Sequence, residues 1–218
     1  MNVVLMGPPG VGKGTQAAAL KGLLGVPHVS TGDILRASMN EGSPLGKKVK
    51  EYVESGRLVP DDLMGDLIAD RLGRHDAAKG FILDGFPRTM EQVTILDGVL
   101  SRLGRSLDRV LILAVPEGEI VRRLAGRRSC PKCGAVFHLE SRPPKAAGIC
   151  DQCGSALVQR KDDTEDVIRE RLNIYASQTV PVAAAYRTKG ILAEVDGLGE
   201  IEDVGSRLKA GLGRTQPA

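Results

Sequence analysis

The chain has 218 residues, of which 42% are hydrophobic and 26% charged, and its formal net charge is +3. That length and hydrophobic content fit one large domain with insertions and exclude a disordered chain. The near-neutral charge and the absence of Trp exclude a broad basic field and a base-stacking surface, so we expect no nucleic-acid partner. No apolar run approaches the roughly 18 residues of a membrane span, and the N-terminus lacks a signal-peptide pattern. We therefore expect no membrane association and a cytoplasmic location.

Along the chain, short apolar runs rich in β-formers alternate with longer segments of helical period. We predict strands at 3–6, 81–83, 110–115 and 191–195, and helices at 63–72, 90–103, 117–124 and 167–186. This alternation predicts an α/β fold with a mostly parallel sheet that is covered by helices on both faces. Two stretches interrupt the alternation and are interpreted as insertions: a polar, helical one at 30–60 and a Gly-, Pro- and Cys-rich one at 127–163. We expect the tail at 213–218 to fray.

A glycine-rich segment, GPPGVGKGT, follows the first predicted strand directly and precedes a helical run. In this position backbone N–H groups and a helix N-terminus can close around phosphate oxygens, and Lys13 supplies a positive charge. The residue after the lysine is Gly14 rather than Ser or Thr, so we expect Mg²⁺ to be held through Thr15, water and the nucleotide. The segment predicts a nucleotide-phosphate site rather than an ordinary glycine-rich turn.

A second motif, FILDGFPR, ends a buried strand with Asp84. A carboxylate there can orient Mg²⁺-bound water. Pro87 restricts the backbone before Arg88, which directs a guanidinium toward the carboxyl ends of the strands, where ligands of open α/β sheets bind. The alternatives are a helix cap for Asp84 and a solvated surface charge for Arg88.

Further arginines stand near loops and segment ends, at Arg36, Arg127, Arg128, Arg160 and Arg171. Phosphoryl transfer spreads charge over the equatorial oxygens of its transition state, so positioned cations do most of the catalysis. An acceptor that is itself a phosphate is already deprotonated and needs no general base. We accordingly expect structural or exposed positions, and no catalytic role, for the histidines outside these motifs, which are His28, His75 and His138.

All four cysteines fall in one segment with the spacing Cys130-x2-Cys133-x16-Cys150-x2-Cys153. This spacing is typical of a structural zinc site, in which two knuckles place four thiolates around one Zn²⁺. A redox couple, disulfides and unoccupied thiols are the alternatives. A full thiolate shell leaves no open position for chemistry, so we expect the metal to stiffen a segment that is too poor in large apolar residues to fold alone.

With these residues assembled, the chain resembles adenylate kinase in its long-lid bacterial form. The likeness covers nearly the whole length and rests, in family order, on GPPGVGKGT, STGDILR, GRLVPDDL, LDGFPRT with Gln92, GRR, RKDD and RERL. The resemblance implies a monomer that transfers the terminal phosphoryl group of ATP to AMP, giving two ADP, with Mg²⁺ and one structural Zn²⁺ per chain. Its role would be adenine nucleotide homeostasis.

The resemblance also implies an architecture. It predicts a P-loop nucleotide-kinase fold with a central parallel five-stranded sheet flanked by helices. The core would comprise 1–29, 60–125 and 164–218. A helical AMP-binding flap would occupy 30–59 and a small β-rich, zinc-stabilised lid would occupy 126–163.

Together with the motifs, the resemblance implies three sets of site residues. The catalytic set is Lys13, Asp84, Arg88, Arg127, Arg160 and Arg171. The ATP set is Gly10, Val11, Gly12, Lys13, Gly14, Thr15, Arg127, Val136, Phe137 and the backbone of Gly199. The AMP set is Thr31, Arg36, Arg57, Leu58, Val59, Gly85, Phe86, Pro87, Arg88, Gln92, Arg160 and Arg171. Asp162 and Asp163 would help to close the lid.

Two other interpretations stay open at this point. Another nucleoside monophosphate kinase, with UMP, CMP or GMP as acceptor, would differ around Thr31 and Gln92. The carboxamide of Gln92 can match the amino group and adjacent ring nitrogen of adenine, but a polar place on a helix surface is its alternative. A P-loop switch or a nucleic-acid-binding zinc-ribbon protein is disfavoured by the charge, the few aromatics and the lack of an N-K-x-D motif.

Overall fold

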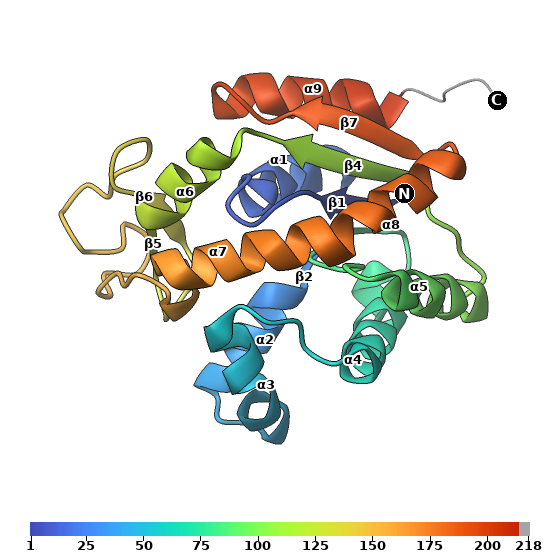
Figure 1. Cartoon of the computed structure of the whole chain (residues 1–218), viewed down its shortest axis with the longest axis horizontal. Helices are drawn as coiled ribbons and strands as arrows, with labels where there is room; N and C mark the ends of the chain where they lie inside the picture. Colours follow the sequence, from blue (N-terminus) through green and yellow to red (C-terminus); the bar gives the residue numbers. More distant parts are fainter. Residues whose placement is uncertain (214–218) are drawn as a thin grey trace.

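The computed structural model describes residues 1–213, which form a central parallel sheet with helices on both faces (Figure 1). The strand order is β2-β3-β1-β4-β7. The strands are β1 (Asn2–Met6), β2 (His28–Ser30), β3 (Phe81–Asp84), β4 (Arg109–Ala114) and β7 (Leu192–Asp196). The α/β prediction is confirmed, and four strands lie within one residue of the predicted bounds. The fifth, β2, has only three residues and polar ends, so the hydrophobic pattern did not reveal it.

Both faces of the sheet are buried, which explains the continuous apolar runs in the sequence. On β1, Val3 and Leu5 face one core cluster and Val4 and Met6 face another. The first cluster lies under α1 (Lys13–Leu24) and α9 (Ile201–Gly213). The second lies under α4 (Asp61–Gly73), α5 (Met90–Arg102) and α8 (Val180–Thr188). Apart from Gly213, the tail that was expected to fray lies outside the described residues.

The first predicted insertion forms two helices that extend away from the sheet in Figure 1, α2 (Thr31–Asn40) and α3 (Pro44–Ser55). The side chain of Ser43 caps α3 by accepting a hydrogen bond from the backbone N–H of Gly46. A Cβ on Gly46 would lie 2.0 Å from the carbonyl oxygen of Ser38. The two helices therefore approach so closely that only glycine fits between them.

The long helix predicted at 167–186 is continuous in space but not uniform. It comprises α7 (Glu165–Ile174), a π-helical turn (Tyr175–Thr179) and α8, drawn together in orange in Figure 1. Pro181 near the start of α8 has no N–H to donate, so the regular α-helical ladder cannot run through it. Turns of this kind are frequent at functional sites.

The second predicted insertion follows α6 (Glu117–Ala125) and holds a small antiparallel pair, β5 (Arg127–Ser129) and β6 (Val136–His138). Two short 3₁₀ turns complete the described chain, His75–Ala77 and Lys161–Asp163. Among the described helices, none combines the length and apolar character needed to cross a membrane. The exact boundaries of core, flap and lid stay predictions.

Candidate functional site

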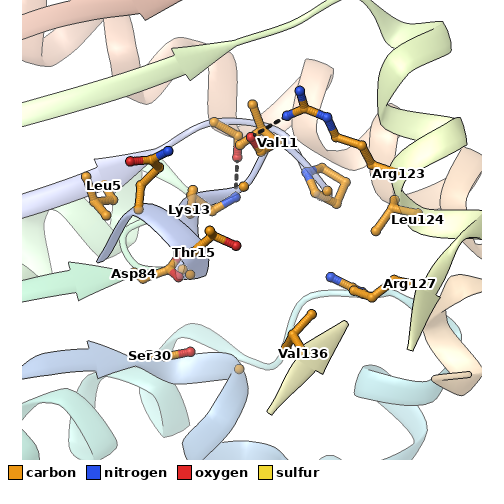
Figure 2. A pocket seen from close by; sticks show the side chains of 18 of the residues that line it. Leu5, Val11, Lys13, Thr15, Ser30, Asp84, Arg123, Leu124, Arg127 and Val136 are labelled. Carbon is orange, nitrogen blue, oxygen red and sulfur yellow. Dashed lines mark hydrogen bonds between the residues drawn. The ribbon is translucent and has the colours of Figure 1, made fainter. Parts of the chain in front are cut away.

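A cavity of about 840 Å³ opens at the carboxyl ends of β1 and β3. The glycine-rich loop and the end of β3 contribute to its lining, as do the segments predicted to form the flap (30–59) and the lid (126–163). Figure 2 shows Lys13 and Thr15 on one side of this space, with Arg127 pointing into it from the lid. This is the place where open α/β sheets bind ligands.

The glycine-rich loop adopts the conformation that a phosphate cradle requires. Gly7, Gly10 and Gly12 have φ angles of 135°, 79° and 104°, which other residues rarely adopt. The loop leads into the N-terminus of α1, whose unpaired N–H groups favour anions. The ammonium group of Lys13 donates to the carbonyl oxygens of Gly7 at 2.8 Å and Pro8 at 2.9 Å. Burial lowers the pKa of Lys13 to about 8, so the site favours an anion that would offset this charge.

Asp84 and Arg88 lie together where β3 ends. Asp84 is 8% exposed, and its carboxylate lies 3.5 Å from Nε2 of His28. Arg88 donates from Nε to the carbonyl oxygen of Gly85 at 2.7 Å, and burial lowers its pKa. The hydroxyl of Thr179, at the end of the π-helical turn, donates to the carbonyl oxygen of Arg88 at 3.0 Å. The turn thus anchors the helix that carries Arg171 to the loop that carries Arg88.

Two arginines pair with two carboxylates at the end of segment 126–163, and a third, Arg160, donates to the hydroxyl of Ser129 at 2.8 Å. Arg127 makes a two-point contact with Asp163, at 2.5 and 2.7 Å. Nη1 of Arg171 lies 3.0 Å from a carboxylate oxygen of Asp162 and 3.3 Å from one of Asp163. Burial lowers the pKa of Arg160 to about 9 and that of Arg171 to about 10, with neighbouring arginines adding to the effect. The two carboxylates do not fully offset this density of positive charge.

The structure brings together the predicted phosphate-handling residues. The cavity lining includes Lys13, Asp84, Arg88, Arg127, Arg160 and Arg171. It also includes Gly10, Val11, Gly12, Gly14, Thr15, Val136, Phe137 and Gly199 of the predicted ATP set. From the predicted AMP set it further includes Arg36, Leu58, Gly85, Phe86 and Pro87. These placements agree with the predicted roles, which stay predictions.

Four other predicted AMP residues, all in the described part of the chain, are not among the residues that line it: Thr31, Arg57, Val59 and Gln92. Gln92 is 2% exposed and both ends of its carboxamide are occupied. Its oxygen accepts from the backbone N–H of Arg88 at 2.7 Å, and its nitrogen donates to Asp61 at 2.7 Å. With Thr89 accepting from the N–H of Gln92, the pair caps α5.

Several cavity residues were missed by sequence reasoning. Arg123 donates to the carbonyl oxygens of Val11 at 3.0 Å and Gly197 at 3.1 Å. It stands in the last turn of α6, before β5 begins, and belongs to none of the sequence motifs. His28 and His138 line the cavity as well, whereas His75 is exposed on its 3₁₀ turn. The cavity placement of the two histidines depends on tertiary contacts, and no motif marks it.

The four cysteines form a second, separate centre. Their sulfur atoms all lie within 4.8 Å of one another, with Cys130 and Cys150 buried. The two knuckles are built alike: Gly134 N–H donates to Cys130 O at 3.0 Å and Gly154 N–H donates to Cys150 O at 2.9 Å. Four converging sulfurs without a disulfide are positioned to bind a metal ion.

The fold and the cavity together define a P-loop protein built to bind and transfer phosphoryl groups. The family model of adenylate kinase matches residues 5–191. Adenylate kinase of Citrifermentans bemidjiense is 51% identical over 212 residues, covering 97% of this chain and 99% of that protein. Those of Symbiobacterium thermophilum and Archaeoglobus fulgidus are 49% and 48% identical, each covering 96% of this chain and 97% of theirs. The chain belongs to the adenylate kinase family, which is a family of phosphotransferases.

Proposed function

We propose that this chain catalyses the reversible transfer of the terminal phosphoryl group of ATP to AMP, giving two ADP, as an adenylate kinase acting in adenine nucleotide homeostasis. The observation that carries the proposal is that all five predicted catalytic cations are among the residues lining one cavity: Lys13, Arg88, Arg127, Arg160 and Arg171. Family membership supports ATP, AMP and ADP as the substrates. The chain would act as a cytoplasmic monomer.

The two nucleotides would occupy the two arms of the cavity. The glycine-rich loop holds the phosphates of ATP. The adenine base of ATP lies with Val136 and Phe137 of the lid on one side and the backbone of Gly199 on the other. AMP enters from the flap side, where Arg36 and Arg88 meet its phosphate. The acceptor oxygen is already ionised, so positioned cations suffice and no side chain acts as nucleophile.

Arg127, Arg160 and Arg171 stabilise charge on the group in transfer. In the free protein Arg127 and Arg171 pair with Asp162 and Asp163, which hold the guanidiniums in place until phosphates arrive. Preorganised cations of this kind lower the barrier because they need no rearrangement when charge develops. Thr31, Arg57, Val59 and Gln92 would complete the AMP site on closure of the flap.

Closure of the lid and the flap would exclude water, which otherwise competes with AMP for the phosphoryl group. Two contacts already join the two insertions. The ammonium of Lys161 lies 3.0 Å from the carboxylate of Glu54, and the side chain of Asn40 donates to Pro131 O at 3.5 Å. These contacts fit an arrangement in which a lid at 126–163 and a flap at 30–59 move on a core. The core would comprise 1–29, 60–125 and 164–218.

Two metal ions complete the proposal. Thr15 and Asp84 line the phosphate end of the cavity, and their oxygen atoms suit a hard cation such as Mg²⁺, which when bound with ATP neutralises charge on the phosphates. Cys130, Cys133, Cys150 and Cys153 would hold one structural Zn²⁺, because four thiolates at tetrahedral spacing fill its shell. That centre would keep the lid rigid.

The test is an acceptor screen. ADP formation is measured with ATP and Mg²⁺ plus AMP, CMP, UMP or GMP, beside a reaction without acceptor. The proposal expects AMP to be the preferred acceptor by at least about tenfold in kcat/KM, and little ATP hydrolysis without acceptor. Preference for another monophosphate would assign the chain to a different acceptor, and hydrolysis without transfer would refute the proposal.

A further inference from the structure

Gln16 lies on the first turn of α1, directly behind the glycine-rich loop, and contributes to the cavity lining. It is 4% exposed. Its Nε2 donates to the carbonyl oxygen of Ile201 at 2.9 Å, across 185 residues of sequence. Within the described part of the chain, its Oε1 is buried and has no hydrogen-bond partner.

The orientation of this carboxamide is fixed by its partner. A carbonyl oxygen can only accept, so the amide nitrogen must face Ile201 and the amide oxygen must face the other way. On that other side Gly205 lies close, since a Cβ built on it would be 3.3 Å from Oε1, and no donor among the described residues reaches the oxygen. An unsatisfied buried oxygen costs about 1–3 kcal/mol. An unbranched apolar side chain would fill this space without that cost, so the bond to Ile201 is the contribution of the amide that the structure shows.

The bond ties the start of α1 to the segment 197–201, which lines the donor end of the cavity beside Gly199. The other end of this segment is held separately. Gly197 donates to Ala114 O at 2.8 Å and accepts from Arg123 at 3.1 Å. Gln16 therefore sets the position of the Ile201 end relative to the glycine-rich loop.

We infer that Gln16 is a positioning residue for the donor nucleotide: it fixes the separation between the phosphate cradle and the segment 197–201 that meets the donor base. This inference rests on the proposed function, since it takes ATP to be the donor with its base at Gly199. One ATP molecule would contact the phosphate cradle and the segment 197–201 at once. A fixed spacing between them therefore lowers the entropic cost of ordering the site when ATP binds. The acceptor arm shares none of these contacts.

The test replaces Gln16 with Met, which keeps the length and apolar packing and removes both amide groups. The matched control is Leu20→Met, at a buried position on the same helix that makes no side-chain hydrogen bond. KM for ATP is measured at saturating AMP, and KM for AMP at saturating ATP. Inhibition by inorganic tripolyphosphate, which carries phosphates but no base, reports on the phosphate cradle alone.

We expect Gln16→Met to raise KM for ATP by about three- to tenfold, as for the loss of one buried hydrogen bond. KM for AMP and inhibition by tripolyphosphate should change less than twofold. The melting temperature should match that of Leu20→Met or exceed it, because the unpaired oxygen is gone.

Equal rises in the two KM values, or an equal loss of tripolyphosphate inhibition, would overturn the inference because the damage would then be general. A lower melting temperature with KM for ATP unchanged would also overturn it, since the amide would then be structural only. These outcomes differ from failure of the proposed function, which the wild-type protein would reveal by making no ADP from ATP and AMP.

Discussion

Replacing Asp163 tests the electrostatics of the site most severely, because its one buried carboxylate pairs with both Arg127 and Arg171. Its side chain is 0% exposed, and the side chains of Arg127 and Arg171 are each 17% exposed. Asp163→Asn keeps the shape and removes the charge, which leaves Arg127 without a carboxylate. Breaking a buried pair by removing one partner costs about 3–5 kcal/mol. Asp162 still lies 3.0 Å from Arg171, so we expect the lower end, about 3 kcal/mol.

For a chain of this length, each kcal/mol lowers the melting temperature by about 2–4 °C, so the variant should melt about 6–12 °C below wild type. Thermal denaturation followed by circular dichroism measures this in the absence of nucleotides. Asp166→Asn, which removes an exposed carboxylate from the first turn of α7, is the matched control and should shift the midpoint by less than about 2 °C. Saturating ATP should reduce the difference in melting temperature between Asp163→Asn and the wild type, because phosphates then neutralise Arg127. Equal melting of the two variants would refute the electrostatic reasoning.

Three other predictions concern the metal centre and the cations. Cys130→Ser should lose bound metal, measured by elemental analysis, and melt lower while retaining turnover at low temperature; full metal content with unchanged melting would contradict the role assigned to the centre. Arg88→Ala should lower kcat by at least about 100-fold in steady-state kinetics, and a rise in KM alone would count against a transition-state role. Lys13→Met should lower turnover by at least about 100-fold without lowering the melting temperature at pH 7. The pKa of Lys13 falls from 10.5 to about 8 in the folded state, so its charge opposes folding below pH 8 and this penalty is relieved as pH rises toward 10.5; a clear loss of stability would contradict this.

The strands of the sheet could be predicted where both faces are buried, because the sequences of such parallel strands are unbroken apolar runs. β2 escaped this logic: its three residues, His28–Ser30, carry a single apolar side chain, and pairing with β3 is what makes them a strand. The helix at 167–186 was placed correctly, yet its π-helical turn depends on Pro181 and on the contact of Thr179 with Arg88. Such a contact joins residues far apart in sequence, so the hydrophobic periodicity of the sequence does not reveal it.

The grouping of the predicted phosphate-handling residues around one cavity could be predicted, because each belongs to a short motif whose glycines and cations suit a phosphate site. Arg123, His138 and Gln16 could not, since each acts through a partner that only the fold supplies. Gln92 shows the opposite difficulty. Its paired donor and acceptor suggested a base contact, and in the structure the same two groups cap α5 and hold Asp61. A donor–acceptor pair is informative about a ligand only once its internal partners are known.

The charges of the cavity show why a site of this kind binds phosphates so readily. Nine Lys and Arg side chains line it, against four carboxylates, and Asp162 and Asp163 beside it pair with two of the arginines. Burial and neighbouring cations lower the pKa of Arg160 and Arg171, which means that their charge is held at a cost in the free protein. Anionic phosphates would relieve this cost on binding, and the same cations would meet the charge that the proposed transition state spreads over the equatorial oxygens. Under the proposed function, the imbalance that destabilises the free site would therefore stabilise the transition state.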